Sequence, residues 1–338
     1  MENKWDGNII GNSAAPYENG LIKNYSFAYN YYAIDLSGLK NYLALFDGID
    51  QINNYSTWCS PNQCNYTGQN FFELMQNRGL TWRGYAESMP SNCYPYEYPY
   101  TGNNGSVGEY WPIHTSIPYF TDIAKYCSMN DLPLGNITAQ RGNFYNDLHS
   151  NNNFANFSMI TPNVCDDMHS CPINTSDVWL SKLVPTIIQS CYFYNTVTFI
   201  SFDNFPDNLS APIPMFVIGP PTLVNYGTFN ETYNHYSTLA TMENIFHLGN
   251  LGKNDTLATP MSAIIPSASP NGTPTTTTKT GSTISTLNSC PSSTTASDSQ
   301  NNKSPSPLSF LLAIAVFVVL AAGIVASALF ARKRQSAS

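Results

Sequence analysis

The chain has 338 residues, enough for one large domain or two medium ones, and its formal net charge is −8. Only 11% of the residues are charged, against about 25% in an average soluble domain. No basic stretch occurs before the last seven residues. We therefore expect no nucleic-acid partner, because binding to a polyanion requires a basic surface.

Residues 1–252 are predicted to form a folded head. Within it, the stretch 31–48 is typical of the start of a helix at an active site, and it raises the question of whether Ser37 is a nucleophile. Residues 50–115 are rich in Tyr, Pro and Gly. They predict a long insertion over the sheet ends, which could be a lid over a site or a structural loop with aromatic packing.

The rest of the head alternates between apolar runs and helical patterns. Short apolar runs bounded by Pro, Asn or Asp predict buried strands at 117–123, 156–163, 196–204 and 214–220. Apolar residues at helical spacing predict helices at 177–190 and 235–249. This alternation favours an α/β fold with a mostly parallel sheet, in which ligands bind at the carboxyl ends of the strands.

Polar side chains follow two of these predicted strands. Asp203 closes the run 196–204, and Asp167 and His169 lie between two cysteines after the run 156–163. Carboxylates together with an imidazole suit a divalent cation or a phosphoryl group, although Asp side chains also cap turns.

Two further histidines are candidates for the same site. His235 begins a predicted helix, where backbone N–H groups favour an anion, and the alternative is a solvated side chain. His114 precedes a predicted strand and is a weaker candidate.

Eight cysteines are typical of an oxidising compartment. Cys59 with Cys64, and Cys165 with Cys171, could each close a short disulfide loop. The head holds an odd number of cysteines, so one of them is expected to be free or to pair outside the head. Zinc binding is the competing interpretation, although no Cys-x-x-Cys pair occurs.

Twelve N-x-[ST] sequons favour an exported glycoprotein that carries N-linked glycans. They begin at Asn24, Asn54, Asn65, Asn104, Asn136, Asn156, Asn174, Asn208, Asn230, Asn254, Asn271 and Asn302.

The C-terminal part predicts a membrane anchor. Residues 253–307 are rich in Ser, Thr and Pro and predict an extended stalk. Residues 308–330 carry no charge and are long enough for a transmembrane helix. The basic tail at 331–338 is expected to be cytoplasmic, which makes the protein a single-pass cell-membrane protein with an extracellular head. The alternative is a buried core helix. No signal peptide follows Met1, so we expect an export segment upstream of it.

Several segments together resemble the phosphoesterase family of acid phosphatases and phospholipase C-type enzymes, within the alkaline phosphatase superfamily. They are "MENKWDGNIIGNSAAPYENGLIKNY", "AIDLSGLKNYLALFDG", "PYFTDIA", "NFSMITPNVCDDMHSC", "SDVWLSKLVPTII", "VTFISFDN" and "YNHYSTLATMENIF". The resemblance covers nearly all of residues 1–250. It implies a three-layer α/β/α sandwich, and a further strand before Met1.

The resemblance also implies the residues of the site. A divalent metal ion of unknown identity would be bound by Glu2, Asn3, Asp203, Asn204 and Asp167. Catalytic roles would fall to Ser37, Asn41, His169, His235 and His114.

The chain departs from the family pattern at the nucleophile. Gly38 aligns with the family's Ser or Thr, Leu36 with its His, and Lys40 with a Pro. Gly38 has no hydroxyl, so Ser37 would have to attack in its place. Asn204 replaces an acidic metal ligand.

These features predict a surface-tethered, metal-dependent phosphoesterase that hydrolyses phosphate esters. The alternatives are an impaired member of the family that binds a phosphorylated or glycan ligand, and a surface glycoprotein that reuses the scaffold.

Overall fold

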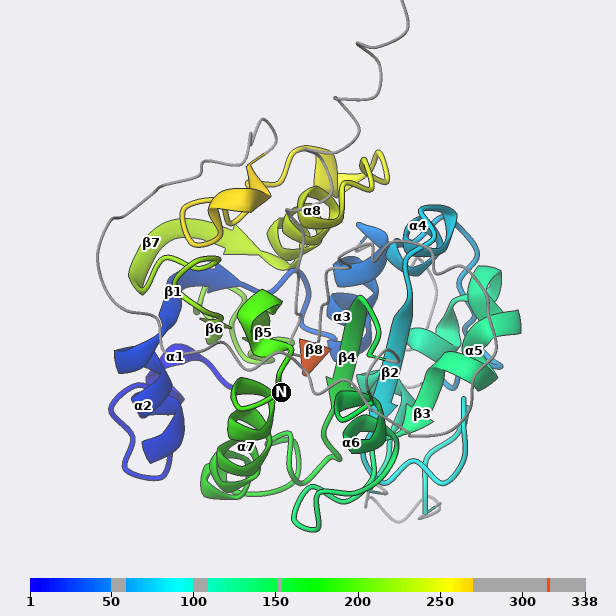
Figure 1. Ribbon diagram of the computed structural model, residues 1–338, viewed down its shortest axis with the longest axis horizontal. Coiled ribbons are helices and arrows are strands. Elements are labelled where there is room, and N and C mark those ends of the chain that lie inside the picture. The colour runs from blue at the N-terminus through cyan, green and yellow to red at the C-terminus, as the bar shows by residue number, and fades with distance from the viewer. Residues whose placement is uncertain (50–58, 100–108, 151–153, 270–314, 317–338) are drawn as a thin grey trace, which may run out of the picture.

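Eight strands form two four-stranded sheets in the computed structural model, which describes residues 1–49, 59–99, 109–150, 154–269 and 315–316 (Figure 1). The strands are β1 (Ser26–Tyr32), β2 (Trp82–Ala86), β3 (Asp131–Pro133), β4 (Phe157–Thr161), β5 (Thr198–Ser201), β6 (Met215–Ile218), β7 (Gly227–Asn234) and β8 (Ala315–Val316). One sheet has the order β5-β6-β1-β7 and the other β3-β2-β4-β8. All pairs are parallel except those that β6 makes with β1 and β5. The fold is therefore mixed α/β, with a largely parallel arrangement as expected.

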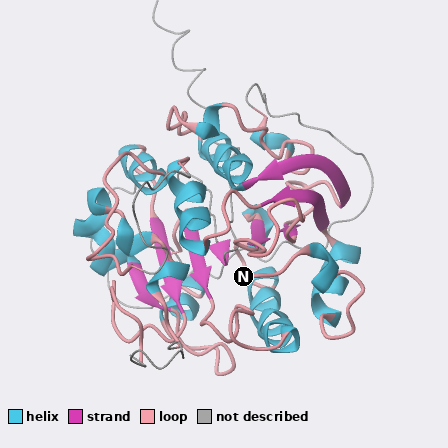
Figure 2. Ribbon diagram, turned by 180° about the vertical axis from the view of Figure 1, so that it is seen from behind, coloured by secondary structure: helices cyan, strands magenta, loops and turns pink. Residues whose placement is uncertain are grey.

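The described residues contain eight α-helices. They are α1 (Asp6–Ile9), α2 (Pro16–Asn24), α3 (Gly38–Asp47), α4 (Phe71–Asn77), α5 (Ala124–Asn130), α6 (Asn143–Leu148), α7 (Ile173–Ile188) and α8 (His235–Phe246). Helices α3, α4 and α8 pack on one another, and α2 packs on α7. Figures 1 and 2 show the strands running between these two groups.

Local sequence explains why α3 and α8 begin and end where they do. Helix α8 starts after Asn234, whose side chain accepts from Ser237 N in a capping box. Helix α3 ends at Gly48, which adopts a left-handed conformation with φ 76°. The buried side chains of α3 include Leu39, Leu43 and Phe46, which join the main hydrophobic core. Core packing therefore fixes the position of α3, and with it the position of its N-terminus.

Two expectations about the middle of the chain are wrong. The run 117–123 forms two 3-10 turns, Ile117–Tyr119 and Thr121–Ile123, and not a strand. Pro118 lies in the first of these turns, and a proline cannot donate to a strand ladder. The segment 50–115 is not simply an insertion, because it supplies α4 and the inner strand β2, which pairs with both β3 and β4.

The beginning of the predicted stalk packs onto the head. Met261, Ile264 and Ile265 are fully buried, and the 3-10 turn Pro266–Ala268 follows them. An extended stalk from residue 253 onwards is therefore wrong up to residue 269, because these apolar side chains join the core. Residues 270–307 lie outside the described part of the chain.

The described residues contain no helix with the length and apolar character needed to cross a membrane. The predicted transmembrane segment 308–330 lies outside the described residues, apart from the backbone of β8. The predicted cytoplasmic tail 331–338 also lies outside them.

Disulfides hold three loops of the head. Cys59 pairs with Cys64 and Cys165 with Cys171, as expected, and Cys93 pairs with Cys127. Cys191 is disulfide-bonded as well. No cysteine in the described residues is free.

Candidate active site

The first three residues of the chain connect the loops that follow β4 and β5. Glu2 N donates to Asp167 O (2.7 Å), and Asp203 N donates to Met1 O (2.9 Å). Asn3 N donates to Asp203 Oδ1 (3.0 Å). These bonds bring the carboxylates of Glu2, Asp167 and Asp203 together, although about 200 residues separate the first from the last.

Three of the side chains gathered here could hold a metal ion. One ligand atom each from Glu2, His114 and Asp167 lie within 4.8 Å of one another, and all three residues are buried. His114 Nδ1 is 2.8 Å from Asp167 Oδ2, and His114 Nε2 is 3.7 Å from Glu2 Oε2. A compact set of carboxylates and imidazole is a typical divalent-cation site.

The electrostatics of the site favour a bound cation. Burial raises the pKa of Glu2 well above its usual value, and the nearby charges of Asp203 and Asp167 raise it further. Burial also raises the pKa of Asp203. Like charges at this separation oppose ionisation in a buried site, and a divalent cation would remove that penalty.

The N-terminus of α3 faces these carboxylates. Gly38 is the first residue of the helix, and Ser37 precedes it without capping it through its side chain. Asp35 Oδ1 accepts from Ser37 N (2.9 Å), and Asp35 Oδ2 accepts from Lys40 Nζ (3.0 Å). The first N–H groups of a helix have no partner within it, so this end of α3 suits an anion.

Asn41 holds the loop that precedes α3. Its Oδ1 accepts from Ile34 N and Asp35 N, and its Nδ2 donates to the carbonyls of Asp35 and Ser37. The side chain is fully buried and does not line the cavity. The resemblance implies a catalytic role for Asn41, and in this geometry all four hydrogen bonds of its amide are made to the loop.

Three buried polar atoms near this helix end have no hydrogen-bond partner. They are Ser37 Oγ, Asp203 Oδ2 and Asn204 Oδ1. The other end of the Asn204 amide is fixed, because Nδ2 donates to Leu36 O (2.9 Å). Unpaired buried acceptors are costly, so their grouping here indicates a binding site. Asp203 Oδ2 and Asn204 Oδ1 are oxygen donors of the kind that a divalent cation takes.

A cavity of about 480 Å³ opens over these groups. It is lined by Glu2, Asn3, Asp35, Leu36, Ser37, Gly38, Trp111, Ile113, His114, His169, Asp203, Asn204 and Pro206. Its polar floor is the carboxylate cluster and the end of α3. Its walls include four apolar residues, one of which, Leu36, is 49% exposed.

His169 and His235 occupy different surroundings. The ring of His169 lines the cavity beside Trp111 and His114, at centroid distances of 5.6 and 5.4 Å, and burial lowers its pKa. His235 is fully buried behind Asp203 and outside the cavity lining, with its Nε2 2.7 Å from Asp203 O and its Nδ1 2.9 Å from Tyr31 Oη. Burial lowers the pKa of His235 to about 4, so the ring is neutral.

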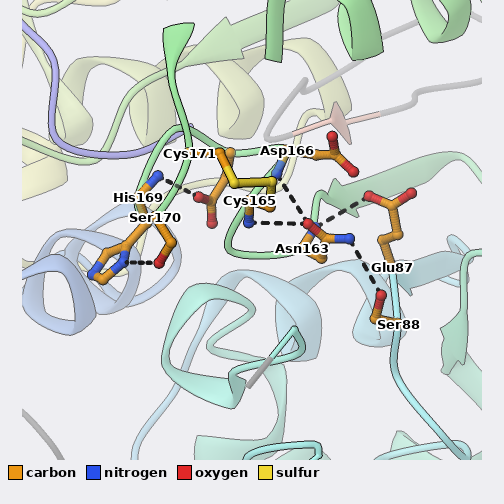
Figure 3. The surroundings of a disulfide bond; sticks show 9 residues. Glu87, Ser88, Asn163, Cys165, Asp166, His169, Ser170 and Cys171 are labelled. Carbon is orange, nitrogen blue, oxygen red and sulfur yellow. Dashed lines mark hydrogen bonds between the residues drawn. A yellow bond between two sulfur atoms is a disulfide. The ribbon is translucent and has the colours of Figure 1, made fainter. Parts of the chain in front are cut away.

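Figure 3 shows that the Cys165–Cys171 loop separates two polar clusters. His169 and Ser170 lie on one side, and Asp166 lies on the other with Glu87. Asn163 organises the second cluster, because its Oδ1 accepts from Cys165 N and Asp166 N. Asp167, by contrast, contacts His114 Nδ1 and accepts from His169 N. The adjacent residues Asp166 and Asp167 therefore face different surroundings, which the sequence alone could not distinguish.

The sequence did not indicate Tyr42 as a site residue. Its hydroxyl donates to Glu2 Oε1, and its ring stacks on His114 with centroids 6.2 Å apart. Tyr42 follows Asn41 in a helix that reads as apolar, so no local signal distinguishes it from a core residue. Trp111, beside His114 and His169, was missed because it lies in the segment 50–115, where an aromatic side chain also fits a structural loop.

Comparison with known proteins is consistent with this geometry. The model of the phosphoesterase family matches residues 10–249. A phosphatidylinositol-3-phosphatase of Mycobacterium tuberculosis is 27% identical over 74% of the chain and 76% of its own length. A probable acid phosphatase of Kluyveromyces lactis and an acid phosphatase of Aspergillus niger are each 26% identical, over 67% and 54% of the chain. The chain spans only about half the length of these two relatives, 52% and 43%.

Proposed function

Because the chain belongs to the phosphoesterase family, we propose that it hydrolyses phosphate esters in the cavity between α3 and the carboxylate cluster. The observation that carries this proposal is the group of unpaired buried atoms at the N-terminus of α3: Ser37 Oγ, Asp203 Oδ2 and Asn204 Oδ1. A hydroxyl and two oxygen donors at a helix N-terminus are the parts that phosphoryl transfer needs.

The end of α3 would bind the phosphoryl group. Its first N–H groups and the positive end of the helix dipole favour the oxygens of a phosphate. Gly38 leaves this end of the helix open, because it has no side chain to cover the N–H groups. Asn41 keeps the preceding loop in place through its four hydrogen bonds.

The acidic cluster would hold a divalent cation. Glu2, Asn3, Asp203, Asn204 and Asp167 are the proposed metal-site residues, with Asp203 Oδ2 and Asn204 Oδ1 free of other partners. When bound, such a cation polarises a phosphoryl oxygen and offsets the charge that develops on it.

Ser37 is the proposed nucleophile. It lines the cavity, it adjoins the open end of α3, and its Oγ makes no competing hydrogen bond. His169 lines the same cavity and is the proposed proton donor to the leaving group; because burial lowers its pKa, it would carry that proton only at acidic pH. His235 would act indirectly, because its Nε2 holds the backbone carbonyl of Asp203.

A second candidate function is ligand binding without turnover. Gly38 removes the hydroxyl from the family's nucleophile position, Asn204 carries no charge, and Lys40 is paired with Asp35. Such a protein would bind a phosphorylated or glycan ligand and release it unchanged. A surface glycoprotein that reuses the scaffold is a third possibility, and the buried carboxylate cluster argues against it, because purely structural carboxylates at this density are costly.

Attachment to a membrane also belongs to the proposal. The uncharged run at 308–330 followed by Arg332, Lys333 and Arg334 supports a single-pass anchor with the head outside the cell. The sequons support N-linked glycans on that head.

The test is a phosphatase assay of the purified chain across pH and divalent metal ions, with Ser37→Ala and Asp203→Asn. We expect Ser37→Ala to lower kcat/KM by about 10³-fold or more, as loss of a nucleophile does. Ser210→Ala and Asp207→Asn are matched controls, because both residues are exposed.

The outcomes separate the candidates. Activity that survives Ser37→Ala but not Asp203→Asn would show that water attacks in place of the serine. Absence of turnover with any metal ion, together with saturable binding of inorganic phosphate, would reject hydrolysis in favour of ligand binding.

A further inference from the structure

The two ring nitrogens of His114 face two different carboxylates. Nδ1 is 2.8 Å from Asp167 Oδ2, a hydrogen bond, whereas Nε2 is 3.7 Å from Glu2 Oε2, too far for one. When the His114 ring is neutral, Nδ1 carries its proton, because the Asp167 carboxylate can only accept. The lone pair of Nε2 then points into the space shared with Glu2.

That space has the dimensions of a metal site. Two ligands at about 2.0–2.2 Å from a common ion lie roughly 3–4 Å apart, and the Nε2 to Oε2 distance falls in this range. A lone pair opposite a carboxylate oxygen is repulsive unless a proton or a cation lies between them, and 3.7 Å is too long for a shared proton.

Asp203 supplies a further oxygen donor beside Glu2. Its Oδ1 accepts from Asn3 N, while Oδ2 is buried and has no partner. An atom added at the Cβ position of Gly38 would lie 2.7 Å from Asp203 Oδ2 and 3.6 Å from Glu2 Oε2. Both oxygens therefore border one small volume at the start of α3.

Both oxygens of Asp167 already have hydrogen-bond partners. Its Oδ2 accepts from His114, and its Oδ1 accepts from His169 N (2.7 Å). A carboxylate that holds the far nitrogen of a histidine fixes the ring's tautomer and direction toward a metal ion. Asp167 thus matches the outer member of a carboxylate–histidine–metal arrangement better than it matches a ligand.

We propose that His114 Nε2 binds the cation together with Glu2 and Asp203, and that Asp167 is the positioning residue of His114. This inference rests on the cation of the proposed function and replaces Asp167 with His114 in its ligand set. An imidazole among the ligands favours Zn²⁺ or Co²⁺, whereas Mg²⁺, Ca²⁺ and Mn²⁺ prefer oxygen donors. The site therefore selects a first-row transition-metal ion.

The experiment measures metal binding without substrate. The metal-free full chain is titrated with Co²⁺, Zn²⁺ and Mg²⁺ by calorimetry, and the visible absorption of the Co²⁺ form is recorded. We expect Co²⁺ and Zn²⁺ to bind at least tenfold more tightly than Mg²⁺. His114→Gln should weaken Co²⁺ binding at least tenfold and shift the visible bands, while Mg²⁺ binding changes less than threefold.

The Asp167→Asn variant tests whether Asp167 positions the ring of His114. It should weaken Co²⁺ binding about 10–100-fold, as loss of an outer partner does, and leave one ion per chain. His149→Gln is the control. His149 is exposed, and its Nδ1 contacts Tyr145 O and not the carboxylate cluster. Circular dichroism checks that each variant is folded.

A measurement on the unmodified chain covers the case in which a variant fails to fold. The Co²⁺ form should show a hyperfine-shifted, exchangeable imidazole N–H resonance from Nδ1 of the bound histidine. Absence of that resonance, or tighter binding of Mg²⁺ than of Co²⁺, would overturn the inference. If Co²⁺ binds as expected but no phosphate ester is hydrolysed, the proposed function fails while this inference stands.

Discussion

The Cα of Gly38 lies so close to Asp203 that a Cβ atom at this position would be 2.7 Å from Asp203 Oδ2. Real Cβ contacts are longer, so any other residue at position 38 requires the carboxylate or the helix end to move. The absence of a side chain at the start of α3 and the direction of the Asp203 carboxylate are therefore linked. A substitution at position 38 should affect cation binding as well as attack on the phosphoryl group.

Gly38→Ala is predicted to weaken cation binding about tenfold, a typical effect of disturbing a ligand's surroundings. The added methyl would turn Asp203 Oδ2 away from the space that it shares with Glu2. Calorimetric titration with Zn²⁺ measures the effect. Gly20→Ala is the matched control, because its added Cβ would meet no atom within 4 Å and it lies within α2. Equal affinities for Zn²⁺ in the two variants would contradict the link between position 38 and the Asp203 carboxylate.

Tyr31→Phe is predicted to lower the free energy of unfolding by about 1–2 kcal/mol. Because the Asp203 carbonyl accepts from His235 Nε2, the Nδ1 atom needs a donor, which is the Tyr31 hydroxyl. That hydroxyl also contacts Thr238 Oγ1 (2.8 Å). Urea unfolding of this variant, with Tyr29→Phe in the same strand as control, measures the loss. A change in the free energy of unfolding no larger than that of the control would show that this buried hydrogen-bond network does not stabilise the fold.

Glu243→Gln is predicted to stabilise the protein at pH 8 and to flatten its pH dependence. Burial and then the charge of Asp255 raise the pKa of Glu243 to about 9. In the unfolded chain the pKa of Glu243 is near the usual value of 4.5, so the free energy of unfolding falls as pH rises from there to about 9. Gln mimics the protonated form and should gain about 1–3 kcal/mol at pH 8.

Thermal and urea unfolding between pH 5 and 9 measure this difference. The exposed Glu231→Gln is the control. If Glu243→Gln and the unmodified chain keep the same difference in stability at every pH, the buried acid does not have the predicted pKa.

Among the predicted glycosylation sites, Asn156 is expected to remain unmodified in the folded protein. It is 8% exposed, and its Oδ1 accepts from both Thr81 N and Thr81 Oγ1 at 2.9 Å. Asn136 and Asn174 are exposed and are expected to accept glycans in a glycosylating host. Mass spectrometry of glycopeptides identifies which of these three asparagines carries a glycan. A glycan on Asn156 of folded protein would refute the assignment.

Local patterns were sufficient for several elements. Helix α8 follows its apolar spacing and its cap at Asn234, and strand β5 lies within the apolar run at 196–204. The family was evident from the order of its motifs. Strand β2 was missed because Arg83 and Gly84 interrupt its apolar pattern. The structure explains this glycine, since a Cβ there would lie 2.5 Å from Asp131 Oδ1.

The candidate site, like the fold, was predicted only in part from local patterns. Sequence patterns were enough to show which residue types were available for the site: the acids, the amides and the imidazoles that follow predicted strands, and the glycine at the expected nucleophile position. They could not determine direction, because whether a side chain lines a cavity or holds its neighbour depends on contacts between distant segments. Only the tertiary structure showed that Asp166 and Asp167 point to different clusters, that His235 lies behind Asp203, and that His114 bridges two carboxylates. Those contacts form when the strand ends of the packed sheets meet, and no local rule of spacing encodes them.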